Sequence, residues 1–425
     1  MKCSPIDKKY KGSKIRKKVL IIVWNNFTHD KRVMNISDSL VNNEYKVTVI
    51  AAKEQKGLSL FEQKGYRIFR IPLFSSLYSL QNKFEINGLK QQGKKRYSIK
   101  SFLKNNRLRK MITAFLNWAG FNFGVLSKGL FLKPDIIHAN DLDTLTVGYI
   151  LSKLLKTKLI FDSHELWLLG NKYDHSSKLR KWWWRFIQKK LISEVDKLIV
   201  TTEYRGELLK KQYNLKNINV IHNCPKYVEV KKSDVLRQEY GIPTDNVILL
   251  YQGLLTEKRG IFAIVDAIKS IGKVITIFMG MGNDKKKLEE YIVEKQLEGR
   301  MFVKDAVAPN ELQKYTSSAD IGLQLLYNTD INHYSTISNK LLEYFMAGLA
   351  IVASDFPEIN KIITENNNGI VVDPENKVQI RKAITKLVTN RDLLESFKLN
   401  SKNNRHKYTW EEEEKVLLRI FSEIS

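Results

Sequence analysis

Short runs of apolar, β-branched residues alternate along this chain with segments long enough to form amphipathic helices. The expected strands are Val19–Trp24, Lys46–Ala51, Tyr66–Ile71, Asp135–Ala139, Lys158–Asp162, Lys197–Thr201, Val220–His222, Val247–Tyr251, Val274–Met279, Met301–Val303, Ile321–Leu325, Ala350–Ser354 and Gly369–Val372. Nearly continuous apolar strands separated by helices are typical of parallel sheets that are covered on both faces. We therefore predict an α/β protein with two doubly wound, Rossmann-like domains in succession.

The length of 425 residues also suggests two domains, because a single hydrophobic core rarely grows that large. The last expected strand of the first half ends at His222, and a charged stretch, Lys226–Glu239, follows it. We predict an N-terminal domain over residues 15–225, a C-terminal domain over 226–405 and a final helical segment over 406–425. Open α/β sheets bind ligands outside the carboxyl ends of their strands, so the expected site is the cleft between the two domains.

The two cysteines cannot form a disulfide framework, which suits a reducing compartment. The N-terminal region is basic, but its apolar run, Val19–Trp24, is too short for a signal peptide or a membrane span. We therefore expect a cytoplasmic protein.

The formal net charge of +26 is concentrated in two stretches. Ile86–Pro134 contains eleven Lys or Arg and no acidic residue, and Ser176–Ser193 contains six basic residues around Trp182–Trp184. Such a composition suits an anionic membrane surface, a solvated basic face or nucleic acid. We favour the membrane, because Trp flanked by Lys and Arg suits the headgroup region. No nucleic-acid-binding motif accompanies the charge, so no nucleic-acid partner is expected.

The segment Ser335–Gly348 has the features of a loop that enters a helix. Ser338 is the expected N-cap, and Asn339 and Lys340 then place amide groups and a positive charge where an anion can bind. Glu343 lies one turn further on, where its carboxylate can accept hydrogen bonds from ribose hydroxyls. A diphosphate at the amides and a ribose at the acid describe a nucleotide sugar. An ordinary amphipathic helix with an exposed Glu is the alternative.

This segment resembles the C-terminal signature of glycosyltransferase family 4, in the branch that has Ser-x-x-Asn-Lys before the Glu. The resemblance extends from about Lys17 to Ile420. Its other motifs are Asn26–Val33, Asp135–Thr144, Phe161–Glu165, Gly253 with Arg259-Gly260, and Met279–Gly282. It implies the GT-B architecture, with a donor site in the interdomain cleft and a last helix that crosses back to the first domain. It also implies a retaining sugar transfer without a metal ion or other cofactor.

For the donor, the resemblance implies contacts from Gly253, Arg259, Gly280, Gly282, Val307, Ser338, Asn339, Lys340 and Glu343. The first acid of the family's Glu-x7-Glu pattern falls on Ser335, and the first cation of its pyrophosphate clamp falls on Leu254. Arg259 keeps the second cation, and an arginine can hold phosphate oxygens in a fork. A simple turn is the alternative interpretation of Gly280 and Gly282. The loop around Val307 is where main-chain groups are expected to recognise the base.

In the first domain, His138 and Asp141 follow a buried strand, and His164 and Glu165 follow the next one. A histidine beside an acid at the carboxyl end of a strand suits acid–base work or substrate orientation, and a structural histidine is the alternative. The family often has a second histidine where Asn140 stands. On the acceptor side, the resemblance implies Asn26, Asp30 and Arg32.

The predicted activity is transfer of a sugar from a UDP- or GDP-sugar to a glycan or lipid-linked acceptor during bacterial envelope polysaccharide or lipopolysaccharide assembly. The predicted location is the cytoplasmic face of the cell membrane. Because Ser335 and Asn140 depart from the family pattern, a catalytically silent GT-B partner in a polysaccharide assembly complex is the alternative. A sugar-nucleotide epimerase is a further alternative.

Overall fold

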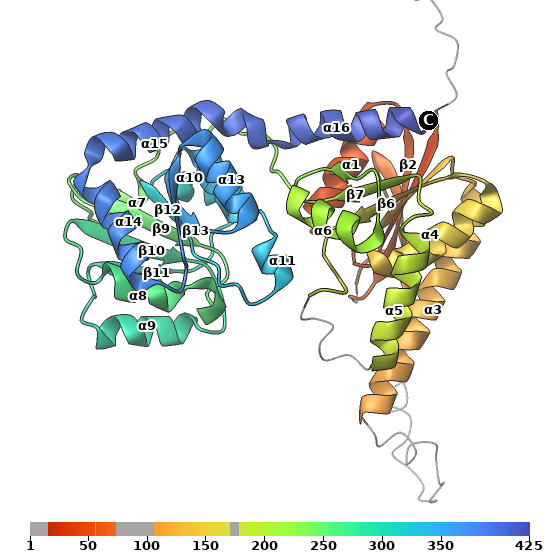
Figure 1. Ribbon diagram of the computed structural model, residues 1–425, viewed down its shortest axis with the longest axis horizontal. Coiled ribbons are helices and arrows are strands. Elements are labelled where there is room, and N and C mark those ends of the chain that lie inside the picture. The colour runs from red at the N-terminus through yellow and green to blue at the C-terminus, as the bar shows by residue number, and fades with distance from the viewer. Residues whose placement is uncertain (1–15, 56, 74–105, 171–177) are drawn as a thin grey trace, which may run out of the picture. The chain divides into compact units, whose positions relative to one another are not determined.

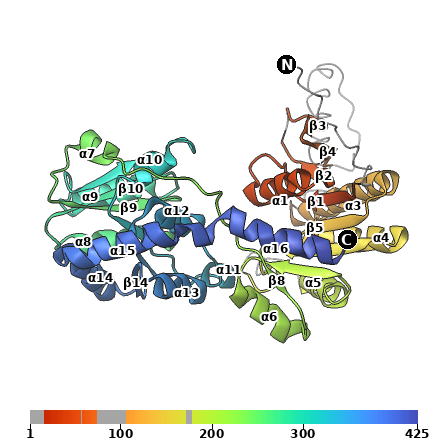
Figure 2. The ribbon, with the colours of Figure 1, turned by 90° about the horizontal axis from the view of Figure 1, so that it is seen from above.

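The structure, a computed structural model, describes residues 16–55, 57–73, 106–170 and 178–425. The basic stretch before residue 106 therefore lies outside the described residues. In the rest, parallel strands alternate with helices and form two sheets (Figures 1 and 2), as the apolar runs predict. The α/β fold class with two doubly wound sheets is confirmed.

The first sheet has eight strands in the order β3-β4-β2-β1-β5-β6-β7-β8, and Figure 2 shows β3, β4, β2, β1 and β5 following one another across it. Its strands are β1 Lys18–Val23, β2 Lys46–Lys53, β3 Phe61–Lys64, β4 Tyr66–Pro72, β5 Ile136–Asn140, β6 Lys158–Ser163, β7 Lys197–Val200 and β8 Asn219–Val220. The helices between them are α1 Lys31–Asn42, α3 Asn106–Leu132, α4 Leu142–Leu155, α5 Lys178–Leu191 and α6 Glu203–Tyr213.

The antiparallel edge strand β3 was not predicted. Its residues Phe61-Glu62-Gln63-Lys64 have no apolar alternation, and they pair with β4 through a tight turn at Gly65. Two side-chain contacts join the strands: the ring centroids of Phe61 and Phe69 are 5.0 Å apart, and Arg70 Nη1 donates to Glu62 Oε1 (2.5 Å). Cross-strand pairing of this kind depends on the partner strand, so a short polar run gives little signal by itself.

The second sheet has six strands in the order β11-β10-β9-β12-β13-β14. Its strands are β9 Val247–Gln252, β10 Val274–Met279, β11 Met301–Lys304, β12 Ile321–Gln324, β13 Ala350–Ser354 and β14 Gly369–Val372. The helical segments around it are α7 Val235–Tyr240, η3 Glu257–Arg259, α8 Ile261–Ile268, α9 Lys285–Glu294, α10 Leu312–Thr316, α11 Ile331–Tyr334, α12 Asn339–Ala347, α13 Pro357–Asn366, α14 Lys377–Thr389, α15 Arg391–Asn404, η4 Arg405–Tyr408 and α16 Trp410–Glu423.

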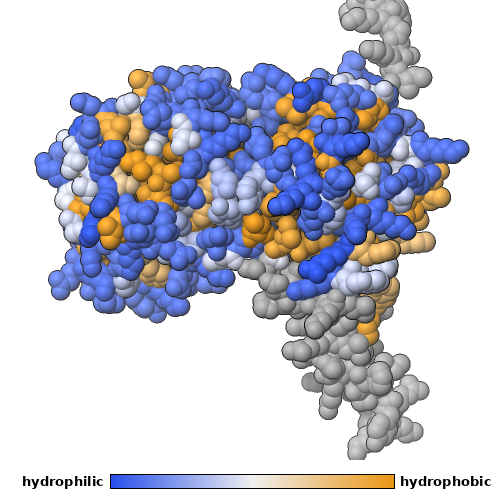
Figure 3. All heavy atoms as spheres, in the orientation of Figure 1, coloured by the Kyte–Doolittle hydropathy of each residue, from blue (hydrophilic) through white to orange (hydrophobic). Residues whose placement is uncertain are grey.

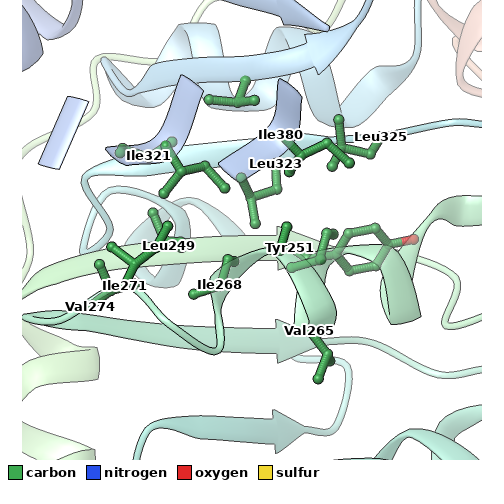
Figure 4. Packing of buried hydrophobic residues seen from close by; sticks show 14 of the residues in the cluster. Leu249, Tyr251, Val265, Ile268, Ile271, Val274, Ile321, Leu323, Leu325 and Ile380 are labelled. Carbon is green, nitrogen blue, oxygen red and sulfur yellow. The ribbon is translucent and has the colours of Figure 1, made fainter. Parts of the chain in front are cut away.

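Alternate side chains of β9 enter two different cores, as expected for a strand that is covered on both faces. Leu249 and Tyr251 pack with Ile380 of α14 and with residues of α8 (Figure 4), whereas Ile248 and Leu250 pack with residues of α12 and α13. Every residue of β9 and β10 is buried. The sheet is thus held rigidly, and the loops at the carboxyl ends of its strands have a fixed base.

Contacts within the chain divide it into two compact units. Unit 1 comprises residues 1–162, 190–198 and 420–425, and unit 2 comprises residues 163–189 and 199–419. Helix α16 contributes to both units: Phe421 packs against Tyr45 in unit 1, and the backbone N–H of Trp410 donates to Pro225 in unit 2. Each unit is described by itself below.

Candidate functional site

The loops after β9 and β10 lie against each other in unit 2. The backbone N–H of Gly253 donates to Met279 (2.9 Å), and that of Leu255 donates to Met281 (2.8 Å). A Cβ atom on Gly280 would lie 1.8 Å from the carbonyl oxygen of Gly253, and one on Gly282 would lie 2.1 Å from that of Leu255. Both glycines are therefore required by the close approach of the two loops, whatever else they contact.

The loop after β9 leads into η3 and then into α8. Arg259 ends η3, and Gly260 follows it with a φ of +72°. The Arg259 side chain is partly exposed, whereas Leu254, where the family's other cation is expected, has an exposed fraction of 48%. The structure thus places one cation of the expected clamp on this loop.

Helix α12 begins as predicted. The hydroxyl of Ser338 caps it by accepting from the backbone N–H of Leu341, and the hydroxyl also accepts from Gln324 Nε2 (3.0 Å). At the other end, Gly348 adopts a left-handed conformation with a φ of +74°. The first backbone amides of a helix lack intrahelical partners and attract anions, so this end of α12 suits a phosphate.

Lys340 lies in the first turn of α12 with an exposed fraction of only 7%. Among the described residues, its ammonium group has no hydrogen-bond partner, and its Nζ atom lies 4.0 Å from the centroid of the Tyr251 ring. Burial, and then the charge of Arg259, lower the pKa of Lys340 well below its usual value, and Glu343 opposes the shift. Burial and the charge of Arg259 thus disfavour the charged form of Lys340, and a bound anion would favour it.

Glu343 lies on the same helix and is held by side chains from two other elements. Gln252 Nε2, at the end of β9, donates to Glu343 Oε2 (2.6 Å), and Thr316 Oγ1 of α10 donates to Gln252 Oε1 (2.8 Å). Gln252 and Thr316 were not predicted as site residues. A polar residue at the end of an otherwise apolar strand was the signal for Gln252, but nothing in the sequence links Thr316 to it.

Two further donor-site predictions lie on loops of unit 2. Val307, in the segment between β11 and α10, is partly buried and packs against the core beneath α12. The Asn339 side chain accepts from Asn223 Nδ2 (3.4 Å).

In unit 1, Arg32 of α1, His138 of β5 and Asp162 of β6 form a buried polar cluster. Arg32 and Asp162 are joined by two hydrogen bonds of 3.0 Å, and His138 Nε2 lies 3.4 Å from Asp162 Oδ2. The exposed fractions are 4% for Arg32 and 0% for the other two. This burial favours a role in orienting neighbouring groups for His138 and Arg32, because neither side chain is open to solvent.

Asp141, at the N-cap position before α4, has a φ of +61°. A positive φ at a residue other than glycine is uncommon and is often found at functional sites. Burial, and then the carboxylate of Asp141, raise the pKa of Asp143 well above its usual value. Asn140, at the position of the family's second histidine, is buried and donates to the carbonyl of Ile22 (2.9 Å).

The predicted acceptor-side residues Asn26 and Asp30 make local bonds. Asn26 Oδ1 accepts from the backbone N–H groups of Glu54 (2.7 Å) and Gln55 (3.2 Å). Asp30 caps α1 by accepting from Val33 N (3.1 Å) and also accepts from Asn25 Nδ2 (2.8 Å). These bonds hold the loop after β1 in one conformation.

His164 and Glu165, which belong to unit 2, are partly exposed. The carbonyl of His164 accepts from the Arg205 guanidinium. Arg205 also donates to Ser335 Oγ (3.0 Å), so the residue that replaces the family's first acid is bound to an arginine. Sequence reasoning did not single out Arg205, because nothing in the pattern of α6 marks it as buried.

One group of side chains among the described residues has a spacing that could hold a metal ion: Glu203, His222 and Glu358. His222 Nδ1 lies 2.8 Å from Glu413 Oε1, and His222 Nε2 lies 3.4 Å from Glu203 Oε2. Burial opposes a charge on His222, but hydrogen bonds to Glu203 and Glu413 outweigh it and raise the pKa of His222 to about 9. A protonated His222 therefore already supplies a positive charge here, and none of the predicted donor residues belongs to the group.

No helix within the described ranges is both long and apolar enough to cross a membrane.

Comparison with known proteins agrees with this architecture. Residues 232–404 match the family model "Glycosyl transferases group 1", and residues 30–224 match "Glycosyltransferase Family 4". The chain is a glycosyltransferase with the GT-B fold. The two matched families are the group 1 and family 4 glycosyltransferases, so the predicted class of enzyme is confirmed.

The individual relatives have low sequence identity to this chain. The chain is 22% identical to an uncharacterized glycosyltransferase of Methanocaldococcus jannaschii, over 65% of this chain and 72% of the relative. It is also 22% identical to the chitobiosyldiphosphodolichol beta-mannosyltransferase of Candida albicans, over 60% of each chain. Among solved structures, HepE of Anabaena in complex with UDP is similar with a TM-score of 0.71, at 14% identity, over 96% of this chain and 100% of HepE.

Proposed function

We propose that this glycosyltransferase takes its sugar from a nucleoside diphosphate sugar, UDP- or GDP-linked, and that the donor binds in unit 2 at the N-terminus of α12. The observation that carries the proposal is the buried ammonium of Lys340, which has no hydrogen-bond partner among the described residues and is repelled by Arg259. A diphosphate would neutralise both cations and accept from the amides of α12. The UDP in the HepE complex is consistent with such a donor.

The remaining donor contacts follow from this placement. Glu343, held by Gln252, would accept hydrogen bonds from the ribose, and the segment around Val307 would contact the base. As the sugar departs, negative charge builds on the diphosphate, so Arg259, Lys340 and the helix amides would stabilise the transition state. We propose retention at the anomeric carbon, with the acceptor hydroxyl attacking from the face that the leaving group vacates and no metal ion required.

For the acceptor, we propose a lipid-linked glycan at an anionic membrane, as in the assembly of envelope polysaccharide or lipopolysaccharide. Helix α5 supports this, because it has no acidic residue and exposes Trp182 (60%), Trp183 (45%) and Phe186 (47%) while Trp184 is buried. In Figure 3, blue, white and orange spheres lie beside grey ones in the region where Figure 1 shows α5 and α3. The lipid diphosphate in the name of the Candida albicans relative points the same way.

The donor proposal is tested by calorimetry with UDP- and GDP-sugars, followed by transfer and hydrolysis assays with and without EDTA. We expect one nucleotide class to bind and turnover to persist in EDTA. Arg259→Ala should lower turnover at least a hundredfold without changing the melting temperature. Arg381→Ala, on the exposed face of α14, is the matched control and should have no effect. Near-normal turnover in folded Arg259→Ala would remove this assignment.

The membrane proposal is tested by sedimentation with vesicles of phosphatidylcholine, with and without phosphatidylglycerol. Binding should require the anionic lipid, weaken with salt and fall at least tenfold in Trp182→Ser/Trp183→Ser. Leu399→Ser, at an exposed apolar residue of α15, is the control. Equal binding to neutral vesicles would contradict the role of charge.

The second candidate function is that of a catalytically silent GT-B partner in a polysaccharide assembly complex. It is motivated by Ser335 and Asn140, neither of which is an acid or a histidine and both of which are buried by contacts within the protein. A wild-type protein that binds a nucleotide sugar but neither transfers nor hydrolyses it would favour this candidate.

A further inference from the structure

Arg205 lies on α6 and is buried, with an exposed fraction of 6%. Thr202 caps this helix by accepting from the backbone N–H of Arg205, so the arginine projects from the rigid first turn of the helix. An arginine is rarely buried unless its planar set of donors is used. The bonds that it makes therefore indicate what it does.

The guanidinium group of Arg205 donates to three separate parts of unit 2. It bonds to Thr201 Oγ1 (2.5 Å) and to the carbonyl of His164. It also reaches the segment before α12, where it donates to the carbonyl of Asn332 (3.1 Å) and to Ser335 Oγ (3.0 Å). One side chain thus joins the His164 loop to the segment that leads into the donor-binding helix.

Two further hydrogen bonds reinforce the same connection. The backbone N–H of Leu166 donates to Asn332 Oδ1 (2.8 Å), and Thr202 Oγ1 donates to the carbonyl of Ser335 (3.0 Å). The segment from Asn332 to Ser335 is therefore held at both of its ends. Without Arg205, the segment would depend on these two weaker, neutral hydrogen bonds.

The held segment lies next to the cations of the donor site. Ser335 is three residues before Ser338, the N-cap of α12, and His333 lies between Asn332 and Ser335. Burial, and then the charge of Arg259, lower the pKa of His333, so this imidazole responds to the charge of Arg259. His333 itself is oriented by a contact of 2.9 Å between its Nδ1 and Thr329 Oγ1. A shift of the segment would therefore move groups that surround the diphosphate.

We propose that Arg205 is a positioning residue for sugar transfer, which holds the segment Asn332–Ser338 and the His164 loop in one fixed arrangement. The inference rests on the proposed function, since it assumes that the donor binds at α12. Arg205 does not touch the donor; it acts through Ser335 and His164. Small errors in the placement of reacting groups cost far more in turnover than in binding, because the transition state requires tighter geometry than the bound substrate.

A purely structural role is the competing explanation, and the two roles differ in what they change. A structural arginine lowers stability when it is replaced, and activity then falls only as the folded fraction falls. A positioning arginine lowers kcat in protein that remains folded, while the affinity for the nucleoside diphosphate stays nearly constant. The test must therefore measure stability, binding and turnover on the same variants.

The variants are Arg205→Lys, Arg205→Met and Ser335→Ala in the full chain. A lysine keeps the charge but cannot reproduce the fork that bonds to four oxygens. We expect Arg205→Lys to bind UDP or GDP within threefold of wild type, to change the donor KM less than threefold and to lower kcat at least tenfold. Ser335→Ala should shift the same parameters in the same direction by a smaller factor, and it remains informative if Arg205→Met does not fold.

Arg237→Met is the matched control, because Arg237 is also an arginine of low exposure in unit 2 with several bonds. It donates to Asp320 (3.1 Å) and to the carbonyls of Pro243 and Asn246. This control should lose thermal stability and keep its kcat. An unchanged kcat in Arg205→Lys, or an equal loss of kcat in Arg237→Met at the same loss of stability, would overturn the inference.

Hydrolysis of the nucleotide sugar is a readout that does not need the acceptor. Absence of nucleotide binding by the wild-type protein would refute the proposed donor site itself. Binding without transfer or hydrolysis would overturn the positioning role and favour the silent partner. An active wild type with an unaffected Arg205→Lys would overturn only the inference about Arg205.

Discussion

Replacing Lys340 with methionine should stabilise the empty protein and weaken nucleotide binding. Methionine has nearly the same length and helix propensity as lysine, so the variant removes the charge and leaves the packing of α12 in place. The charge matters because the ammonium is buried with no hydrogen-bond partner in the described part of the chain and lies near Arg259.

The size of the effect follows from two opposing contributions. Leaving a buried donor unsatisfied costs about 1–3 kcal/mol, and more for a charged group. The contact with the Tyr251 ring returns about 0.5–2 kcal/mol, of which a methionine sulfur beside the ring would keep a part. Burial, and then the charge of Arg259, lower the pKa of Lys340 against the opposing charge of Glu343, so the empty protein disfavours the ammonium. We therefore expect the free energy of unfolding of the empty variant to rise by about 1–2 kcal/mol.

The effect on binding has the opposite sign. A hydrogen bond to a charged group contributes about 1.5–3 kcal/mol, so the variant should bind UDP or GDP about ten- to a hundredfold more weakly. Urea unfolding and calorimetry measure the two quantities. Lys398→Met is the control, because the Lys398 side chain is also largely shielded, with 14% exposed, but has Asp320 (3.2 Å) and Glu395 (2.7 Å) as partners. It should lose stability and bind nucleotide normally.

From the lowered pKa of Lys340 we predict that both the stability of the empty protein and nucleotide binding depend on pH. The pKa of this lysine in the folded protein is lowered, so the unfolded chain binds the proton more tightly and the empty protein gains stability as pH rises through the folded-state value. A bound diphosphate raises that value again, so binding above it is accompanied by proton uptake. Calorimetry in two buffers of different ionisation enthalpy measures this uptake, which Lys340→Met should lack. A Lys340→Met protein that is less stable and binds nucleotide as well as wild type would refute the reasoning about Lys340.

Three other predictions concern separate parts of the molecule. Arg32→Met should lower the free energy of unfolding by about 3–5 kcal/mol because it leaves Asp162 buried without its arginine; a loss below about 1 kcal/mol in urea unfolding would contradict this. Gly280→Ala should destabilise the protein and weaken nucleotide binding more than tenfold, whereas Gly272→Ala, where a Cβ meets nothing within 4 Å, should change neither in the same assays. The raised pKa of His222 means that its contribution to stability is complete below about pH 6.5 and is lost as pH rises through about 9, so the unfolding free energy should fall over this range. His222→Gln should lack that fall, and an identical pH profile in the variant would assign it to another group.

The sequence predicts the strands well because a strand that is buried on both faces consists almost entirely of apolar or β-branched residues. Runs such as Val274–Met279 are entirely apolar or β-branched and occupy β10 residue for residue. The same argument explains the correct N-cap at Ser338, where the capping residue and the helix it caps are neighbours in sequence. Features of this kind depend on local composition alone.

Features that depend on contacts between residues far apart in the sequence could not be predicted. Lys340 was expected to add a positive charge, but its burial depends on Tyr251 and Arg259, which come from another strand and loop. Arg205 is a second example, because its bonds reach residues as far as Ser335. The pattern of apolar and polar residues within α6 does not indicate such a contact.

The contrast between two buried basic side chains bears on the proposed donor site. Arg32 in unit 1 and Lys340 in unit 2 are similarly buried, and sequence reasoning assigned both to substrate. Arg32 has a carboxylate with two hydrogen bonds, so the folded chain already compensates the cost of burying its charge. Lys340 has an aromatic ring as its neighbour, and the repulsion by Arg259 outweighs the attraction by Glu343. A diphosphate would therefore release more free energy on binding at Lys340, because there it would remove a penalty that the fold leaves in place, and this difference supports the proposal that the donor binds at α12.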